Sequence, residues 1–203
     1  MEEVVSTVTV VKKNGCVAIA ADTLSSFGSR KLSAVHNKRA SKIVRLGTSF
    51  VGLTGAAANL RVLEHAFRDA QTPALDSAAD IFDVFLKLHD RLKYEYAMNV
   101  RAGQAYESNE MTLLIANQHG IFGIYSMREV VEHERFWAAG SGGDYALGAM
   151  HARYDMATDA ASIAEAGVRA AIEFDDGTGA PVESHVIRLP VLEVEELELL
   201  LKL

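Results

Sequence analysis

Short runs rich in Val, Ile, Thr and Ala open the chain in pairs. In the first pair Asn14-Gly15 separates the runs and predicts a tight hairpin turn, because both residue types tolerate positive φ. In the second pair Gly47-Thr48 takes the same place, so a second hairpin is expected. The runs are residues 6–11 and 16–21 for the first hairpin, and 41–46 and 49–54 for the second.

Apolar residues then recur at helical spacing, which predicts two amphipathic helices at residues 56–70 and 75–98. Strand-like runs return after them, and two more helices and a closing strand follow. The C-terminal residues 191–203 fit either a strand or a helix. The later predicted elements are strands at 111–117, 121–125 and 132–139, a helix opening at 140–143, a helix capped by Thr158 or Asp159, and a strand at 182–189.

This order of elements predicts the fold class. No linker rich in Pro, Ser or Gly divides the chain, so one layered domain is expected. Each antiparallel sheet has an apolar face to bury, and the two sheets bury these faces against each other while helix pairs cover the outside. The prediction is an α+β protein, a four-layer αββα sandwich of two packed antiparallel sheets flanked by helix pairs.

Composition and charge narrow the function classes. The chain has 203 residues, 49% of them apolar, and a net charge of −7 with no basic run. An acidic surface repels polyanions, so neither nucleic acid nor an anionic membrane is expected as a partner. Cys16 is the single cysteine, and no signal peptide or long apolar segment is seen, so a cytoplasmic protein is predicted.

The residues around the first hairpin carry a family resemblance. Ser6 is followed by Gly15, Asp22 and Lys42 in an order and spacing that resemble the opening of proteasome β-type subunits and the bacterial HslV peptidase. In that family a hydroxyl residue becomes the mature N-terminus. Ser in place of Thr, and the longer segment between Asp22 and Lys42, look most like the betaproteobacterial proteasome homologues.

Three later motifs extend the resemblance, which covers residues 6–189. Gly52–Gly55 looks like the Gly-rich strand-to-helix turn of the family, and Gly140–Gly143 looks like its Ser-Gly-Gly helix start. Asp175–Gly179 is similar to the Asp-x-x-Ser-Gly element near the active site. The fold implied is that of N-terminal-nucleophile hydrolases, the same layered sandwich.

The resemblance implies a catalytic set. Ser6 would be the nucleophile and would carry its own base, an α-amine with a pKa of about 7.7–8.0. Lys42, held by Asp22, would favour deprotonation of the Ser6 hydroxyl through its positive charge. The backbone N–H of Gly55 would stabilise the oxyanion.

Further roles come from the same resemblance. Ser141 and Asp175 would lie around the amine. Leu53 and Ala57 would line the pocket for the substrate side chain that precedes the scissile bond. Asp175 and Thr178 would be the ligands of a structural cation, and no cofactor is required.

The nucleophile divides the chain into a short propeptide, residues 1–5, and a peptidase domain, residues 6–203. Thr7 is the alternative nucleophile, but it would shorten the spacing to Asp22 by one residue and reverse the alternation of the strand. Val5 stands where family propeptides usually end in Gly, which leaves open whether removal is autocatalytic.

The predicted function is a self-compartmentalising, proteasome-like endopeptidase that cleaves peptides or unfolded protein. The resemblance implies a homo-oligomer of two stacked rings of six or seven subunits, and the sequence does not imply an AAA+ unfoldase partner. Two alternatives share the motifs: a catalytically inactive structural ring subunit in which Ser6 stays capped, and an N-terminal-nucleophile amidohydrolase acting on a non-peptide amide.

Overall fold

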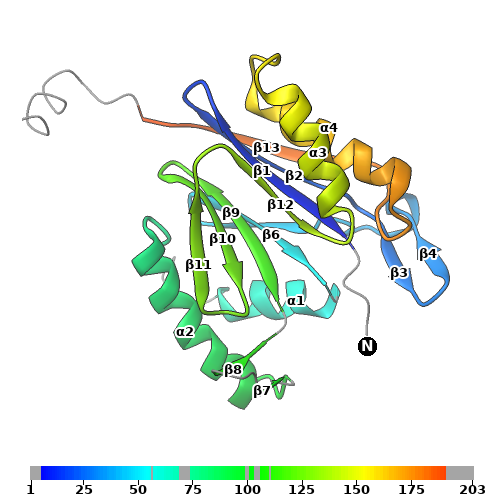
Figure 1. Ribbon diagram of the computed structural model, residues 1–203. Helices are drawn as coiled ribbons and strands as arrows, with labels where there is room; N and C mark the ends of the chain where they lie inside the picture. The colour runs from blue at the N-terminus through cyan, green and yellow to red at the C-terminus, as the bar shows by residue number, and fades with distance from the viewer. Residues whose placement is uncertain are drawn as a thin grey trace, which may run out of the picture.

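Two antiparallel sheets are stacked face to face between two pairs of helices in the computed structural model (Figure 1). The structure describes residues 6–55, 57–68, 74–98, 101–102, 106–109 and 111–190. The predicted four-layer αββα sandwich is confirmed.

The first sheet has the strand order β12-β1-β2-β13, and all its neighbours are antiparallel. Asn14 and Gly15 have φ of 49° and 70°, so the predicted Asn-Gly turn joins the two central strands. The strands are β1 (Thr7–Lys13), β2 (Cys16–Ala21), β12 (Phe136–Gly140) and β13 (Glu183–Arg188).

The second sheet has the order β11-β10-β9-β6-β5, again antiparallel throughout. The second predicted hairpin forms its β5–β6 pair, which delivers the chain into the first helix. The strands are β5 (Ile43–Leu46), β6 (Ser49–Thr54), β9 (Thr112–Asn117), β10 (Gly120–Tyr125) and β11 (Glu129–His133).

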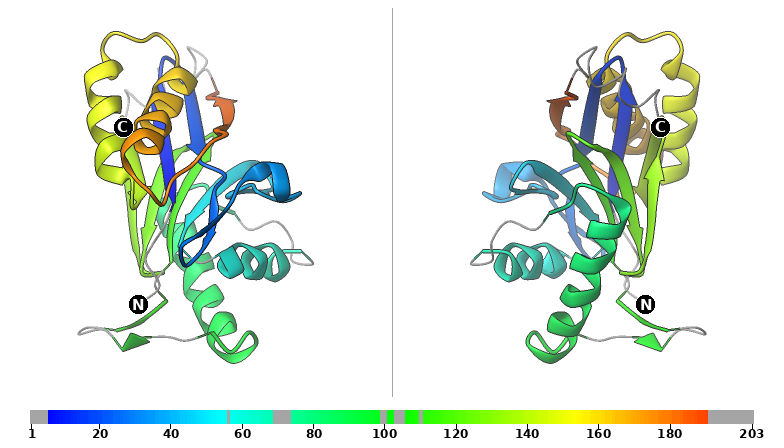
Figure 2. Two further views of the ribbon diagram at one scale, coloured as in Figure 1. Left: turned by 90° about the vertical axis from the view of Figure 1, so that its right-hand side faces the viewer. Right: turned by 90° about the vertical axis from the view of Figure 1, so that its left-hand side faces the viewer.

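The helices cover the outer faces of the sandwich, α3 and α4 on the first sheet and α1 and α2 on the second (Figure 2). Two of them begin at side-chain caps. Asp159, one of the two predicted caps, accepts from the backbone N–H of Ser162, and Ser77, which was not predicted, accepts from that of Asp80. The helices are α1 (Ala57–Ala66), α2 (Ala78–Tyr94), α3 (Gly143–Tyr154) and α4 (Ala160–Phe174).

Short elements fill the connections. The segment between Asp22 and Lys42 forms a small hairpin that projects from the sandwich, followed by one turn of 3-10 helix (Figure 1). The elements are β3 (Ser25–Phe27), β4 (Arg30–Leu32), η1 (Ala34–His36), β7 (Arg101–Ala102) and β8 (Glu107–Ser108).

The core consists of three apolar layers, one between the sheets and one under each helix pair. The sheets approach closely at Gly52, where an added Cβ would lie 2.5 Å from a methyl carbon of Val8. A side chain at this position would therefore push the sheets apart.

One strand prediction was wrong. The single strand expected at 132–139 is two strands, β11 and β12, which belong to different sheets. The chain crosses between the layers at Glu134 and Arg135. A run of apolar and polar residues shows that a segment is strand-like but does not show which sheet it joins, so the crossing is not visible in the sequence. Residues 1–5 and the tail 191–203 lie outside the described residues.

Candidate active site

Ser6 lies immediately before β1, at the end of the first sheet where β1 pairs with β12. Its side chain and backbone are buried, and its φ of 139° is rare for a residue with a side chain. Gly140 faces it closely: a Cβ built on Gly140 would lie 2.0 Å from the carbonyl oxygen of Ser6. Only a glycine permits this approach, which holds the Ser6 backbone in place.

Asp22 follows β2 and is fully buried beside the start of β1. Its Oδ1 accepts hydrogen bonds from the Thr7 backbone N–H at 2.9 Å and from Lys42 Nζ at 2.7 Å. Its Oδ2 accepts from the backbone N–H groups of Leu24 and Gly179, each at 3.0 Å. Four donors thus stabilise the charged carboxylate and fix its orientation.

Lys42 joins Asp22 to the hydroxyl of Ser6. It lies just before β5, and its Nζ is 2.8 Å from Ser6 Oγ and 2.7 Å from Asp22 Oδ1. Burial lowers the pKa of Lys42 below its usual range, and the neighbouring Asp22 carboxylate opposes this shift. The ammonium is therefore held at the hydroxyl oxygen by an ion pair, yet releases a proton more easily than an exposed lysine.

A second chain of hydrogen bonds lies on the backbone side of Ser6. The Ser6 N–H donates to Ser141 Oγ at 3.3 Å, and Ser141 Oγ donates to Asp175 Oδ2 at 2.8 Å. Thr178 Oγ1 also donates to Asp175, and it lies 2.7 Å from Thr7 Oγ1. The Thr7 hydroxyl thus contacts Thr178, whereas the Ser6 hydroxyl contacts Lys42.

The other predicted residues lie where β6 leads into α1. Gly55 follows β6 with a φ of 109°, and a Cβ built there would meet nothing within 4 Å. Leu53 is buried in the apolar layer under α1 and α2, and its backbone N–H donates to the Lys42 carbonyl at 3.1 Å. Ala57 is the first residue of α1, and its side chain is outside the described part of the structure.

The side chains of Asp175 and Thr178, predicted as cation ligands, are hydrogen-bonded to each other. Among the described residues no group of three His, Cys, Asp or Glu side chains is placed to hold a metal ion. Two oxygen ligands are fewer than the six or more that Mg²⁺ or Ca²⁺ takes, so these side chains alone do not form a cation site.

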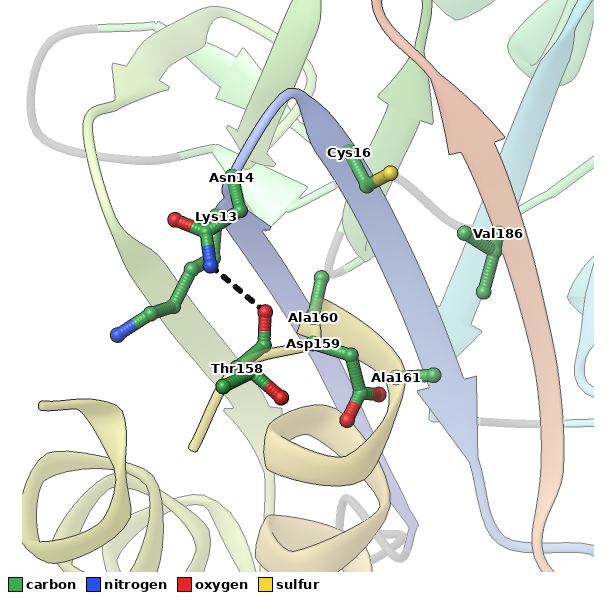
Figure 3. A pocket seen from close by; sticks show the side chains of 8 residues that line it. All are labelled: Lys13, Asn14, Cys16, Thr158, Asp159, Ala160, Ala161 and Val186. Carbon is green, nitrogen blue, oxygen red and sulfur yellow. Dashed lines mark hydrogen bonds between the residues drawn. The ribbon is translucent and has the colours of Figure 1, made fainter. Parts of the chain in front are cut away.

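A surface pocket lies at the opposite end of the β1–β2 hairpin (Figure 3). The seven-residue strand β1 separates it from Ser6 by about 20 Å. Asn14 Nδ2 crosses its rim and donates to the Thr158 carbonyl at 2.7 Å. None of the predicted site residues lines it; the lining is Lys13, Asn14, Cys16, Thr158, Asp159, Ala160, Ala161 and Val186.

Two contacts at the site have only a weak sequence signal. A Cβ on Gly142 would lie 2.3 Å from Thr7 Oγ1 and 2.5 Å from the Ala171 side chain, so α3 starts directly against β1 and α4. The hydroxyl pair of Thr7 and Thr178 links residues 171 positions apart. The repeated glycines at 140–143 were the one available hint of such tight packing.

No protein-family model matches the chain, but curated proteins resemble it over most of its length. The chain is 27% identical to a proteasome subunit beta of Nanoarchaeum equitans over 199 residues, which cover 90% of this chain and 92% of that one. It is 28% identical to an ATP-dependent protease subunit HslV of Bartonella quintana, over 78% of this chain and 77% of that one.

Solved structures show the same similarity. A structure of Thiobacillus denitrificans BPH in complex with Epoxomicin has a TM-score of 0.86 and 45% identity, over 91% of this chain and all of that chain. Eukaryotic HslV from Trypanosoma brucei has a TM-score of 0.63 and 20% identity, over 90% of this chain and 99% of that one. This second similarity is evidence for the fold alone.

The helices that the structure describes are too short or too polar to span a membrane.

Proposed function

The chain belongs to the superfamily of proteasome β-subunits and HslV peptidases, in the branch of the betaproteobacterial proteasome homologues, and we propose that it is a peptidase with Ser6 as its nucleophile. The observation that carries this proposal is the contact of Lys42 Nζ with both Ser6 Oγ and Asp22 Oδ1. A buried hydroxyl beside a paired ammonium is an activated nucleophile.

Cleavage of the peptide bond between Val5 and Ser6 would release the α-amine that serves as base. The Ser6 nitrogen already lies against Ser141 Oγ, which donates to Asp175 and therefore offers a lone pair to an N–H of the amine. This arrangement orients the amine so that its own lone pair is free for the Ser6 proton. The positive charge of Lys42 keeps the neighbouring amine in its neutral form.

The reaction then follows in two steps. The amine takes the hydroxyl proton while Ser6 Oγ attacks the substrate carbonyl carbon, and the Gly55 N–H stabilises the resulting oxyanion. The C–N bond breaks as the α-ammonium returns the proton to the leaving amine, which leaves an ester on Ser6. Water, deprotonated by the same amine, attacks the ester and regenerates the hydroxyl.

Residues 1–5 are proposed to be a propeptide. The rare φ of Ser6 and the tight contact with Gly140 hold its backbone in a strained conformation, which favours attack on the preceding carbonyl by the Ser6 hydroxyl. The oxygen would displace the amide nitrogen, and water would then hydrolyse the ester. Residues 6–203 would remain as the mature peptidase domain.

The assembly proposed is a homo-oligomer of two stacked rings in the cytoplasm, with the sites enclosed and peptides or unfolded protein as substrates. The named relatives, a proteasome subunit and a subunit of an ATP-dependent protease, support an assembly of this kind. Enclosing the active sites within the rings would protect other proteins from unwanted cleavage.

The test is the intact mass of the purified protein before and after treatment with epoxomicin, the compound named in the structure of the Thiobacillus relative. An epoxyketone reacts with a hydroxyl and a free α-amine on one residue. We expect the mass to show loss of residues 1–5 and one adduct per subunit, together with cleavage of an unfolded protein substrate.

Two serine variants make the result specific. Ser6→Ala should abolish the adduct, the cleavage and the loss of residues 1–5, whereas Ser126→Ala, on the turn after β10, should change none of them. An intact, unmodified wild-type chain would overturn the proposal and favour a structural ring subunit. Activity that survives Ser6→Ala would remove Ser6 from the mechanism.

A further inference from the structure

Charge is unevenly distributed along this acidic chain. Residues 23–63 contain no Asp or Glu, but hold seven of the 20 Lys and Arg residues. The rest of the chain holds the other 13 basic residues and all 27 acidic ones. Residues 23–63 therefore form a basic part of the molecule, and their net charge is opposite in sign to that of the rest of the chain.

The basic part includes one edge of the second sheet. Lys38 and Arg39 lie in the segment that leads into the edge strand β5, and Arg45 lies on β5 itself. All three side chains are exposed, and none forms an ion pair with another described residue. We name these three residues the basic edge. A hydrogen bond from Arg61 of α1 to the Arg39 carbonyl ties this segment to the fold.

The other edge of the same sheet is acidic. Glu129 and Glu132 lie on the edge strand β11, and Glu134 follows it. These side chains are exposed too, and they form no ion pair within the described part of the chain. We name them the acidic edge.

The two edges face away from each other. The sheet order β11-β10-β9-β6-β5 places three strands between them, so the edges are about 19 Å apart at the usual strand spacing. Figure 1 shows β11 at the outer margin of the sandwich, beside α2. Opposite charges on opposite sides allow the same surface pair to repeat from one copy to the next.

A pair of stacked side-chain rings, one ring from each sheet, joins the two sheets at each side of the sandwich. Phe50 of β6 stacks on His185 of β13 with centroids 4.3 Å apart, and Arg45 lies 5.9 Å from the Phe50 ring. On the other side His133 of β11 stacks on Trp137 of β12 at 5.0 Å, and Trp137 is 38% exposed. Each side is thus a defined surface with an aromatic component, as protein interfaces commonly have.

We propose that the basic edge of one copy binds the acidic edge of the next copy, in a head-to-tail contact. This inference rests on the proposed function for its setting, because a heterologous contact that closes on itself generates a ring. The partner is a second copy of this chain, selected by charge complementarity.

The charges have a simpler use, which is to keep exposed strand edges from pairing at random. That use requires charge on both edges but does not require opposite signs. Two basic or two acidic edges would protect the strands equally well and would repel each other. The opposite signs are what permit attraction between copies.

The experiment reverses the charges and measures assembly by sedimentation velocity at low and high salt. All proteins carry Ser6→Ala, so the result does not depend on peptidase activity. One variant carries Arg39→Glu and Arg45→Glu, a second carries Glu129→Lys and Glu132→Lys, and a third combines all four changes. Circular dichroism checks that each variant folds.

We expect each double reversal to weaken association at least about tenfold, since like charges would then face each other. The fourfold variant should recover assembly, because its edges are again complementary. Higher salt should weaken assembly of the parent and of the fourfold variant alike. As a control, a variant with Lys87→Glu on α2 and Arg153→Glu on α3 changes the net charge by the same amount as the basic-edge variant. It should leave assembly intact.

The proposal is wrong if either double reversal leaves assembly unchanged, if the fourfold variant stays dissociated, or if the parent is monomeric. Disruption by the basic-edge variant alone would point to a different acidic occupant, such as the Glu-rich residues 191–203, and would also overturn it. The epoxomicin test uses the wild-type chain, which keeps Ser6. If that chain forms no adduct while the Ser6→Ala series assembles as expected, the peptidase proposal is refuted and this contact stands.

Discussion

Replacing Asp22 by Asn should strongly destabilise the protein, although the two side chains have the same shape. The Asp22 carboxylate is fully buried and accepts four hydrogen bonds, one of them from Lys42. The Asn amide group donates, so in either orientation its NH₂ would face donors where the carboxylate accepted. The change also leaves the Lys42 ammonium without its counter-ion.

The magnitude follows from these losses. Breaking a buried ion pair by removing one partner costs about 3–5 kcal/mol. With a urea m-value of about 3 kcal/mol/M, the unfolding midpoint should fall by about 1 M or more. The side chain of Lys42 is 13% exposed, so solvent offers little compensation for the lost charge.

The deficit should depend on pH in a defined direction. Burial already lowers the pKa of Lys42, and loss of Asp22 removes the main group that opposes this shift. Between the lowered folded value and the unfolded value near 10.5, the unfolded chain binds a proton that the folded chain has released. The unfolding free energy of the variant should therefore rise with pH across this window.

The assay is urea unfolding at one subunit concentration, because association contributes to apparent stability. Asp176→Asn, an exposed neighbour of the site, makes the same chemical change and should shift stability by less than about 0.5 kcal/mol. Adding Lys42→Met to Asp22→Asn should restore part of the loss, because it removes the unpaired charge. An Asp22→Asn midpoint close to the wild-type value would refute the reasoning.

Three further outcomes are expected. Lys42→Met alone should slow peptide hydrolysis by at least about a hundredfold in a fluorogenic assay, and an unchanged rate would exclude its electrostatic role. Gly142→Ala should lower the unfolding free energy by about 1–3 kcal/mol because its Cβ would meet the Thr7 hydroxyl, whereas Gly148→Ala, which meets nothing within 4 Å on α3, should raise it by about 0.5–1 kcal/mol. Reversed signs in urea unfolding would contradict the packing. Burial lowers the pKa of His89, so acidification below about pH 6.5 should lower the unfolding free energy, and His89→Leu should flatten this dependence; equal pH profiles would contradict the assignment.

The local elements were predictable because local chemistry determines them. The Asn14-Gly15 turn needs positive φ, and the α2 and α4 starts need side-chain acceptors, all of which the sequence displays. The helical and strand periods likewise indicated two sheets with apolar faces to bury and two pairs of helices to cover them. The strand expected at 132–139 failed because periodicity says which face is apolar, not which sheet a strand joins.

The candidate site likewise has contacts that the sequence predicted and contacts that it did not. Residue types and spacing, with the family resemblance, predicted that Ser6, Asp22 and Lys42 would meet, and the structure places Lys42 Nζ within hydrogen-bond distance of both Ser6 Oγ and Asp22 Oδ1. The Thr7–Thr178 contact and the approach of Gly140 to Ser6 were not predictable, because they join segments more than 130 residues apart. Such contacts depend on the exact stacking of strands and helices.

The sequence by itself determined most of the elements and the αββα class, since these follow from local propensity and apolar period, and its family resemblance supplied the candidate residues for hydrolysis. Only the tertiary structure decided what those residues face. It buries Lys42 between a carboxylate and a hydroxyl, and it places Arg45 and Glu132 on opposite edges of one sheet. Burial, ion pairing and opposed edges are properties of packing, and packing depends on contacts between distant parts of the chain.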